Sequence, residues 1–304
     1  MLLWGVTPLM GQSPPRAVVP RLGEEVNAAM SPDDLTAYVF NTPQIYKLRV
    51  LSSAHKNMWN QYLWAAEKAG LLDNDLLARL RDTVDDNFRG AWAECLAAWF
   101  LAEKLGLDIR PHPPGRGNSC LDLEISSTYG NISVEVKSPF REVKAGEVFF
   151  GLDSDAIQSA AEEANRQFSK TASNLLVLVP QLRISAYDNR YQLIRALFGQ
   201  GIHNFLLDPD TGLMVGGEEA RLDPCGHFLK RYQPEPTPRF TRIGAVLTIE
   251  ERIDSGAGMI DHLALLAHNP HAKNPLPGDI WADLPQLIEQ NGAMVWTDGR
   301  SPWD

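Results

Sequence analysis

The chain has 304 residues, 44% hydrophobic and 22% charged, so it can form one large domain or two small ones around a substantial core. Its net charge of −10 disfavours a nucleic-acid partner, because proteins that bind phosphate backbones usually carry a basic surplus. The three separated cysteines match neither a disulfide framework nor a zinc motif, and no apolar run approaches the roughly 20 residues that cross a bilayer. We therefore expect a soluble cytoplasmic protein with no membrane partner.

The first 85 residues are predicted to hold an irregular arm followed by a helical region. Residues 12–22 (QSPPRAVVPRL) show no regular pattern. Ser31-Pro32-Asp33-Asp34 is typical of a helix start, because proline suits the first turn and acids suit the positive end of the helix dipole. Helical spacing then continues, with interruptions, to about Val84.

The next segment, residues 88–106, is predicted as one strong helix that ends at Gly106. From Gly90 to Ala102 every residue is apolar or small except Glu94, and no lysine or arginine lies three or four positions from it. A helix that is apolar all round is buried, and a buried carboxylate without a partner is destabilising. Glu94 therefore either reaches solvent or a loop, or serves as a functional acid.

Two short alternating runs, LDLEI and ISVEV, follow this helix and are separated by turn residues. Because side chains alternate across a strand, each run is expected to have an apolar and a polar face. The predicted apolar faces consist of Leu121, Leu123 and Ile125 in the first run and Ile132, Val134 and Val136 in the second. The predicted polar faces consist of Asp122 and Glu124 in the first run and Ser133, Glu135 and Lys137 in the second.

A hairpin with an even number of loop residues brings these polar sets together on one face of the sheet. With Tyr129-Gly130 as a two-residue turn, Asp122 lies opposite Lys137, and Glu124 lies opposite Glu135. One interpretation is an antiparallel ribbon with a solvated face, in which the charges have no special meaning. The other is a functional site, since acids outnumber the lysine and repel one another unless a cation joins them.

The rest of the chain alternates between predicted helices and strands up to about Asp254. The tail beyond it, rich in histidine, asparagine and proline, receives no assignment. Helix, two strands, helix and strand in succession indicate an α/β fold whose mixed sheet is covered on both faces. The predicted elements are an amphipathic helix at 153–169, a central strand at 174–181, a helix at 191–199, a hairpin around 208–212 and a strand at 245–251.

The polar cluster has the composition of a divalent-cation site. Mg²⁺ takes oxygen ligands, usually one or two carboxylates, and keeps waters that can meet a phosphate. Asp122, Glu135 and the main-chain carbonyl of Val136 are candidate ligands, and Glu94 is a candidate for a metal-bound water or a second metal. Lys137 is placed to orient an attacking water or to stabilise a charged transition state.

Asp122 together with Glu135-Val136-Lys137, with Glu94 on the preceding helix, resembles the active site of the PD-(D/E)XK nuclease superfamily. The resemblance covers residues 86–182, with the strand near 245–250 as a further candidate element. It implies a restriction-endonuclease-like α/β/α sandwich with a central mixed sheet, preceded here by the N-terminal helical region. It also implies that Asp122 and Glu135 bind Mg²⁺, for which Mn²⁺ can substitute, that Lys137 assists hydrolysis and that Glu94 contributes a metal contact.

The implied function is Mg²⁺-dependent hydrolysis of phosphodiester bonds, with DNA as the expected substrate. The implied organisation is an N-terminal arm and helical region at 1–85, a nuclease-like core at 86–255 and a C-terminal extension at 256–304. The alternatives are an inactive nuclease-like module that binds nucleic acid or protein, a nuclease directed at RNA, and an unrelated α/β protein with a solvated hairpin. A protein partner or a homo-oligomer is a further possibility that the acidic charge leaves open.

Several other residues are secondary candidates for the same site. Glu124 replaces Asp122 as the ligand if the register differs by two, and the resemblance gives Gln167 or Gln158 a place near the site. Lys230 and Arg231 lie in a basic, aromatic segment that is typical of a proline-rich surface connection or, as the alternative, of a nucleic-acid-binding loop. The spacing of His262, His268 and His271 matches no zinc motif.

Overall fold

The structure is a computed structural model. The arm predicted at 12–22 and the helix start predicted at Ser31 lie outside the residues that it describes. The described residues are 53–82, 84–117, 119–139, 154–180, 190–198, 201–202, 205–207, 211, 214–217, 221–222, 228–230, 237–254, 259–290 and 293–299.

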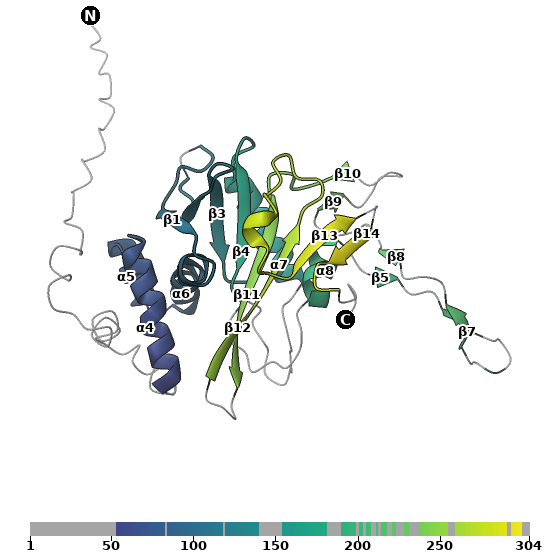
Figure 1. Ribbon diagram of the computed structural model, residues 1–304, viewed down its shortest axis with the longest axis horizontal. Helices are drawn as coiled ribbons and strands as arrows, with labels where there is room; N and C mark the ends of the chain where they lie inside the picture. The colour runs from purple at the N-terminus through teal and green to yellow at the C-terminus, as the bar shows by residue number, and fades with distance from the viewer. Residues whose placement is uncertain are drawn as a thin grey trace, which may run out of the picture.

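An eight-stranded mixed sheet lies at the centre of the protein, in the order β1-β2-β3-β4-β11-β12-β13-β14 (Figure 1). Strand β2 is antiparallel to both β1 and β3, and β4 is parallel to both β3 and β11. Strand β12 is antiparallel to β11 and parallel to β13, and β14 is antiparallel to β13. The strands are β1 (Asp108–Pro111), β2 (Leu123–Ser126), β3 (Ile132–Lys137), β4 (Ser173–Leu178), β11 (Ala245–Asp254), β12 (Met259–His268), β13 (Gln286–Gln290) and β14 (Ala293–Trp296).

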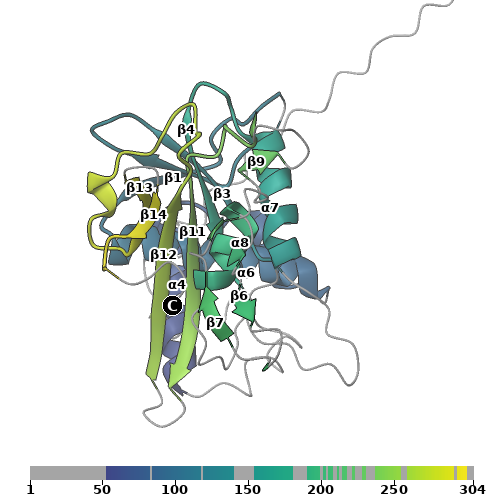
Figure 2. The same cartoon turned by 90° about the vertical axis from the view of Figure 1, so that its right-hand side faces the viewer.

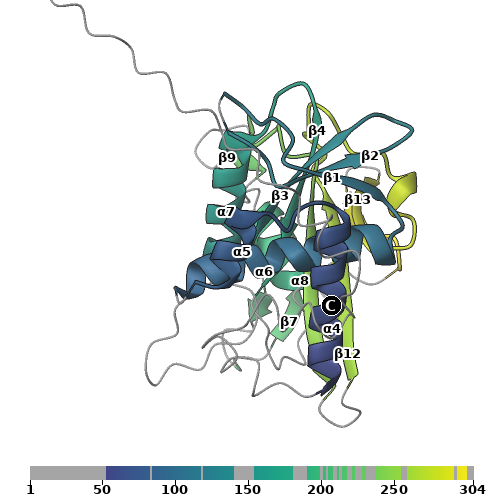
Figure 3. The same cartoon turned by 90° about the vertical axis from the view of Figure 1, so that its left-hand side faces the viewer.

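Helices cover both faces of this sheet, each over its own apolar core. Figure 3 shows α4, α5 and α6 on one face, where α6 continues into a π-helical turn, η1; Figure 2 shows α7 and α8 on the other. No helix within the described ranges is both long and apolar enough to span a membrane. The bounds are α4 (Ser53–Lys68), α5 (Asn74–Leu80), α6 (Asp85–Trp99), η1 (Phe100–Lys104), α7 (Ser154–Gln167), α8 (Arg190–Phe198) and the 3-10 helix η2 (Asp279–Trp281).

These elements confirm the prediction of an α/β protein with a mixed sheet. The helices predicted near 88–106, 153–169 and 191–199 are present, as are the strands predicted near 174–181 and 245–251. The hairpin predicted around 208–212 is formed by β6 and β7. The small strands outside the main sheet pair as β5 (Gly201–Ile202) with β8 (Arg221–Leu222), β6 (Phe205–Leu207) with β7 (Met214–Gly217), and β9 (Leu229–Lys230) with β10 (Thr237–Pro238).

The main sheet includes strands that the sequence analysis did not assign, namely β1 and the C-terminal β12, β13 and β14. The core on the α6 side takes residues from Trp59 to Leu284. Residues of all three predicted segments therefore share one core, while the proposed boundaries between the segments remain a prediction.

The β2–β3 hairpin has a different register from the predicted example. Leu123 pairs with Val134 and Glu124 with Ser133, which puts Asp122 across from Glu135 rather than from Lys137. The turn is displaced by one residue: the Gly130 amide donates to the Ser127 carbonyl at 3.1 Å, so Thr128 and Tyr129 lie at its centre instead of Tyr129 and Gly130. Ser127 closes it, because its hydroxyl accepts a hydrogen bond from the Tyr129 amide (3.2 Å) and donates one to the Gly130 carbonyl (2.6 Å).

The first of the two strands is also shorter than predicted, because β2 begins at Leu123. Leu123 and Ile125 lie in the core on the α6 side as expected, but Leu121 lies in the core beside α7. The prediction that Leu121 shares their face is therefore wrong, since alternation across the sheet applies only where the chain is already in the strand. Asp122 occupies the position just before β2.

A polar network lies within the core where α4 packs on the β11–β12 hairpin. The Tyr62 hydroxyl donates a hydrogen bond to Glu251 Oε1 (2.6 Å), and His262 Nε2 lies 2.6 Å from the same hydroxyl oxygen. Tyr62 is fully buried, Glu251 is 8% exposed, and the rings of Trp92 and Trp99 pack against Tyr62. The network joins α4 to the sheet, and its polar side chains can be buried because each makes a hydrogen bond within the network.

Gly244, just before β11, is expected to tolerate no side chain. A Cβ atom there would lie 2.9 Å from the Asn174 carbonyl oxygen and 3.1 Å from that of Asn274. We expect Gly244→Ala to lower the free energy of unfolding by about 1–3 kcal/mol, because the backbone around it must shift. Urea denaturation measures this effect. Gly278→Ala is the matched control, because no atom lies within 4 Å of its added Cβ, and an equal loss in both variants would contradict the steric explanation.

Candidate active site

Three carboxylates and a lysine from separate elements line one cavity of about 490 Å³. Glu94 comes from α6, Asp122 precedes β2, and Glu135 and Lys137 lie on β3. Glu94 is only 5% exposed and Glu135 only 3%. The structure thus brings together the four residues that the sequence analysis selected as catalytic.

Asp122 is tied to the neighbouring strand by its side chain. Its Oδ2 accepts a hydrogen bond from the main-chain amide of Val136 at 2.7 Å. Burial raises the pKa of this carboxyl well above its usual range, and the charges of Glu94 and Glu135 raise it further. The negative charges of both acids therefore disfavour a charged Asp122, and a cation in the cavity would offset that effect.

Lys137 connects Glu135 to α7. Its Nζ lies 2.9 Å from Glu135 Oε1 and 2.7 Å from Glu163 Oε1. Burial alone would lower the pKa of Lys137, but the charge of Glu135 and the hydrogen bonds to both glutamates raise it instead. The ammonium group is therefore held charged beside the acids.

Glu135 retains an oxygen that the protein leaves unsatisfied. Its Oε2 is buried and has no hydrogen-bond partner, although its other oxygen meets Lys137. Burial raises the pKa of Glu135 despite the opposing charge of Lys137. A buried acceptor without a partner is costly, and a cation bound in the cavity would remove that cost.

Glu94 has its partner outside its own helix, as its sequence environment required. Arg79 of α5 binds it with both terminal nitrogens, Nη1 at 2.6 Å from Oε1 and Nη2 at 3.0 Å from Oε2. The Nε of Arg79 donates to Asp75 at 3.0 Å. The hydrogen bond to Glu94 raises the pKa of the guanidinium, which outweighs the effect of burial. Neither solvent nor a loop satisfies Glu94; an ion pair does.

The main chain of β3 directs a further oxygen toward Asp122. The Lys137 carbonyl accepts a hydrogen bond from Val179, next to β4. Because successive carbonyls of a strand point to opposite sides, the Val136 carbonyl points away from β4, toward the side of β2 and Asp122. This direction agrees with the prediction that Val136 supplies a ligand.

The donor set fits a hard divalent cation, although the side chains are paired with one another as they stand. Among the described residues, no group of three or more histidine, cysteine, aspartate or glutamate side chains is arranged to hold a metal ion. The reason is visible in the contacts, since Arg79 holds Glu94 and Lys137 holds Glu135. The unsatisfied Oε2 of Glu135 and the carboxylate of Asp122 are nevertheless oxygen donors of the kind that Mg²⁺ prefers.

The secondary candidates divide between the cavity and other places. Gln167 lines the cavity, and its amide oxygen is buried without a hydrogen-bond partner. Gln158 does not line it, and its Nε2 donates to the Ala196 carbonyl of α8 at 3.3 Å. Glu124, on β2 between Arg110 and Ser133, also lies outside the cavity lining. Lys230 is described only by its backbone in β9, and Arg231 lies outside the described residues.

Sequence reasoning missed several residues of the cavity. Arg79 was missed because it lies on a different helix from Glu94, its partner. The one available signal was that a buried acid needs a positively charged partner. Arg89, Gly90 and Asp86, all on α6, were also missed, and Arg89 contacts Asp86. The other missed lining residues are Cys120 and Ser138.

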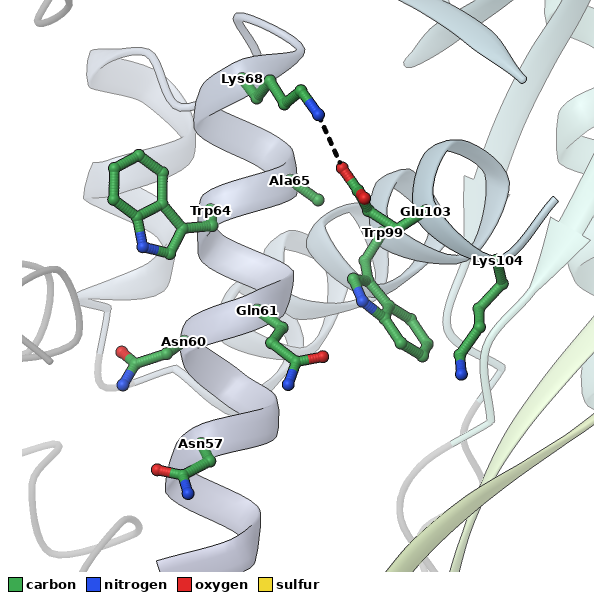
Figure 4. A pocket seen from close by; sticks show the side chains of 9 residues that line it. All are labelled: Asn57, Asn60, Gln61, Trp64, Ala65, Lys68, Trp99, Glu103 and Lys104. Atoms are coloured by element: carbon green, nitrogen blue, oxygen red, sulfur yellow. Dashed lines mark hydrogen bonds and ion pairs between the residues drawn. The ribbon is translucent and has the colours of Figure 1, made fainter. Parts of the chain in front are cut away.

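A second hollow, of about 770 Å³, lies between α4 and the end of α6 with η1 (Figure 4). Lys68 and Glu103 face each other across it at 3.0 Å. Trp64 lines this hollow, whereas Trp59 is buried against Trp92. The other lining residues are Asn57, Asn60, Gln61, Ala65, Trp99 and Lys104.

The tail histidines that the structure places in β12 have structural partners. His262 belongs to the network of Tyr62, and His268 Nε2 lies 2.9 Å from Gln286 Oε1. Burial lowers the pKa of both rings. Both contacts join parts of the core.

Comparison with known proteins adds nothing to this description, because no family model, no curated protein and no solved structure matches the chain. Any conclusion about function therefore depends on the geometry and chemistry of the cavity.

Proposed function

We propose that this protein is a Mg²⁺-dependent nuclease of the PD-(D/E)XK type that hydrolyses phosphodiester bonds in DNA. The observation that supports it most is the convergence of Glu94, Asp122, Glu135 and Lys137 on one cavity, in which Glu94 and Glu135 are buried. The observed order is helix α6, strands β1, β2 and β3, helix α7 and strand β4; apart from the added β1, it is the order on which the resemblance rests. The restriction-endonuclease-like fold is part of the same proposal.

Each residue has a separate task in this reaction. Asp122, Glu135 and the Val136 carbonyl would hold the cation, which when bound neutralises a phosphate oxygen and lowers the pKa of a water. Lys137 holds its charge beside the scissile bond, where it orients the attacking water or stabilises the negative charge of the transition state. The contact of Lys137 with Glu163 fixes the direction of the ammonium group.

The active nuclease is favoured over an inactive module of similar shape. An inactive module has no need to keep three carboxylates and a lysine in a cavity where burial and the neighbouring acids raise the pKa of Asp122, and where an oxygen of Glu135 is left unsatisfied. Functional sites commonly retain such costs because the chemistry depends on them.

The test is cleavage by the purified protein of duplex, single-stranded and branched DNA and of RNA, each with Mg²⁺ and with chelator. We expect Mg²⁺-dependent cleavage of DNA, and we expect Lys137→Ala to slow it at least about a hundredfold, because the positioned charge is lost. Replacement of the exposed Lys273 by alanine is the control and should leave the rate unchanged. Equal degradation of every substrate by the wild type and Lys137→Ala would refute the enzyme assignment, and selective cleavage of RNA would refute DNA as the substrate.

A further inference from the structure

Arg79 occupies the charge-neutralising position that a cation would otherwise take at Glu94. Both terminal guanidinium nitrogens bind the Glu94 carboxylate, one to each oxygen, so a metal or a metal-bound water would have to compete with Arg79 for either oxygen. Lys137 has the corresponding relation to Glu135 but leaves one oxygen unsatisfied. Of the two ion pairs, the one at Glu94 is therefore the one that must change if Glu94 is to take part in cation binding.

Arg79 is placed so that it can leave Glu94 without leaving the cavity. Its side chain is 30% exposed, whereas that of Glu94 is 6% exposed, so the guanidinium lies at the cavity mouth and the carboxylate at its base. Its Nε donates to the largely exposed Asp75, one turn earlier in α5, which tethers the side chain at that mouth. Gly90 lies one turn before Glu94 on the same helical face and has no Cβ to close the opening.

A divalent cation next to Glu94 opposes the guanidinium in two ways. It repels the positive charge of Arg79, and it offsets the negative charge of Glu94 that attracts Arg79. A guanidinium freed in this way has the planar, two-pronged geometry that suits a phosphate. The substrate of the proposed reaction brings phosphates to this same opening.

We propose that Arg79 is a displaceable counter-ion, which neutralises Glu94 in the metal-free site and binds a substrate phosphate once a divalent cation has replaced it. This inference rests on the proposed function, since it requires both a cation and a polyanionic substrate. It makes cation binding and nucleic-acid binding depend on each other through one side chain, and such coupling is necessarily reciprocal.

The test compares Arg79→Gln with the wild type in two binding measurements. First, Mn²⁺ binding without nucleic acid is measured by calorimetry; we expect about five- to tenfold tighter binding in Arg79→Gln, because the competing charge is gone. Second, binding of a short DNA duplex is measured in a Lys137→Ala background, which prevents cleavage. With Mn²⁺ present, Arg79→Gln should weaken this binding about tenfold and lower its salt slope by about one, and with chelator it should change neither.

The controls separate this inference from the proposed function. Arg110→Gln removes an exposed arginine of β1 and should change neither measurement. Unchanged or weaker Mn²⁺ binding in Arg79→Gln overturns the counter-ion role while the proposed function stands, and so does an equal loss of DNA affinity with and without Mn²⁺. A wild-type protein that binds no Mn²⁺ overturns both.

A measurement on the wild type avoids dependence on the folding of the variant. The Nη–H signal of Arg79, assigned by nuclear magnetic resonance, reports the ion pair directly, because Nη1 and Nη2 are the atoms that bind Glu94. We expect Mg²⁺ to shift and broaden this signal as Glu94 is released, and an unchanged Arg79 signal at saturating Mg²⁺ would contradict displacement.

Discussion

Replacing Asp122 with asparagine is expected to abolish cleavage and, at the same time, to make the metal-free protein more stable. The rate should fall by about a thousandfold or more, equivalent to about 4 kcal/mol of transition-state stabilisation, because a principal cation ligand loses its charge. The gain in stability follows from the raised pKa of Asp122, whose charged form is disfavoured first by burial and then by Glu94 and Glu135. Asparagine removes that charge but keeps an oxygen to accept the hydrogen bond of the Val136 amide.

Thermal unfolding with chelator and with Mg²⁺ measures the second effect. With chelator, Asp122→Asn should unfold at a higher temperature than the wild type, by about 1 kcal/mol in free energy. Mg²⁺ should stabilise the wild type but not the variant, since only the wild type binds it. Glu124→Gln is the matched control, because it neutralises a half-buried acid two residues away, outside the cavity. A loss of stability in Asp122→Asn would show that the carboxylate is structural.

In the buried network of Tyr62, substitutions of Glu251 and of His262 are expected to change the pH dependence of stability in opposite directions. Burial raises the pKa of Glu251 to about 7, against the opposing hydrogen bonds from Tyr62 and Trp92. The folded protein then binds more protons than the unfolded chain between about pH 4.5 and 7, so Glu251 lowers stability as pH rises through this range. The full effect is about 3 kcal/mol.

His262 acts in the opposite direction. Burial, with the positive charge of Lys104, lowers its pKa from 6.5 to about 4. The unfolded chain then binds more protons between about pH 4 and 6.5, so His262 raises stability as pH increases through that range. Because the ring is only partly buried, its effect should be smaller than that of Glu251. The two contributions oppose each other in the wild type.

Single substitutions should separate these contributions. The stability of Glu251→Gln relative to the wild type should increase as pH rises from about 4.5 to 7, because the destabilising charge is absent. The relative stability of His262→Gln should decrease as pH rises from about 4 to 6.5. Urea denaturation across this pH range measures both, with replacement of the exposed Glu289 by glutamine as the control. Slopes of the same sign in the two variants would contradict this account of the network.

The site residues were predictable because their sequence environments conflict with burial. A single glutamate in an apolar helix, and alternating acids beside a lysine on a short strand, are local patterns that the sequence displays directly. Parity predicted that Asp122, Glu135 and Lys137 share one face of the hairpin, and all three line one cavity, although Asp122 lies just before β2 and the register is shifted by two residues. The choice between Tyr129-Gly130 and Thr128-Tyr129 as the centre of the turn depended on the hydrogen bonds of Ser127, which the sequence does not display.

Contacts between distant segments could not be read in the same way. Arg79 meets Glu94 only because α5 packs on α6, and no local spacing indicates it. In the tail, the apolar run of residues 263–267 was not assigned as a strand, but it forms part of β12. That run resembles the one in β4, and both become central strands only when the neighbouring elements cover their two faces.

The pairing of charges in the candidate site also bears on how an acidic protein could approach a polyanion. Before any cation binds, the groups that line the cavity carry one more formal negative charge than positive. A divalent ion would reverse that sign, so the pocket would repel phosphate when empty and attract it when loaded, whatever the charge on the rest of the surface. The groups concerned are the cations Arg79, Arg89 and Lys137 and the acids Asp86, Glu94, Asp122 and Glu135.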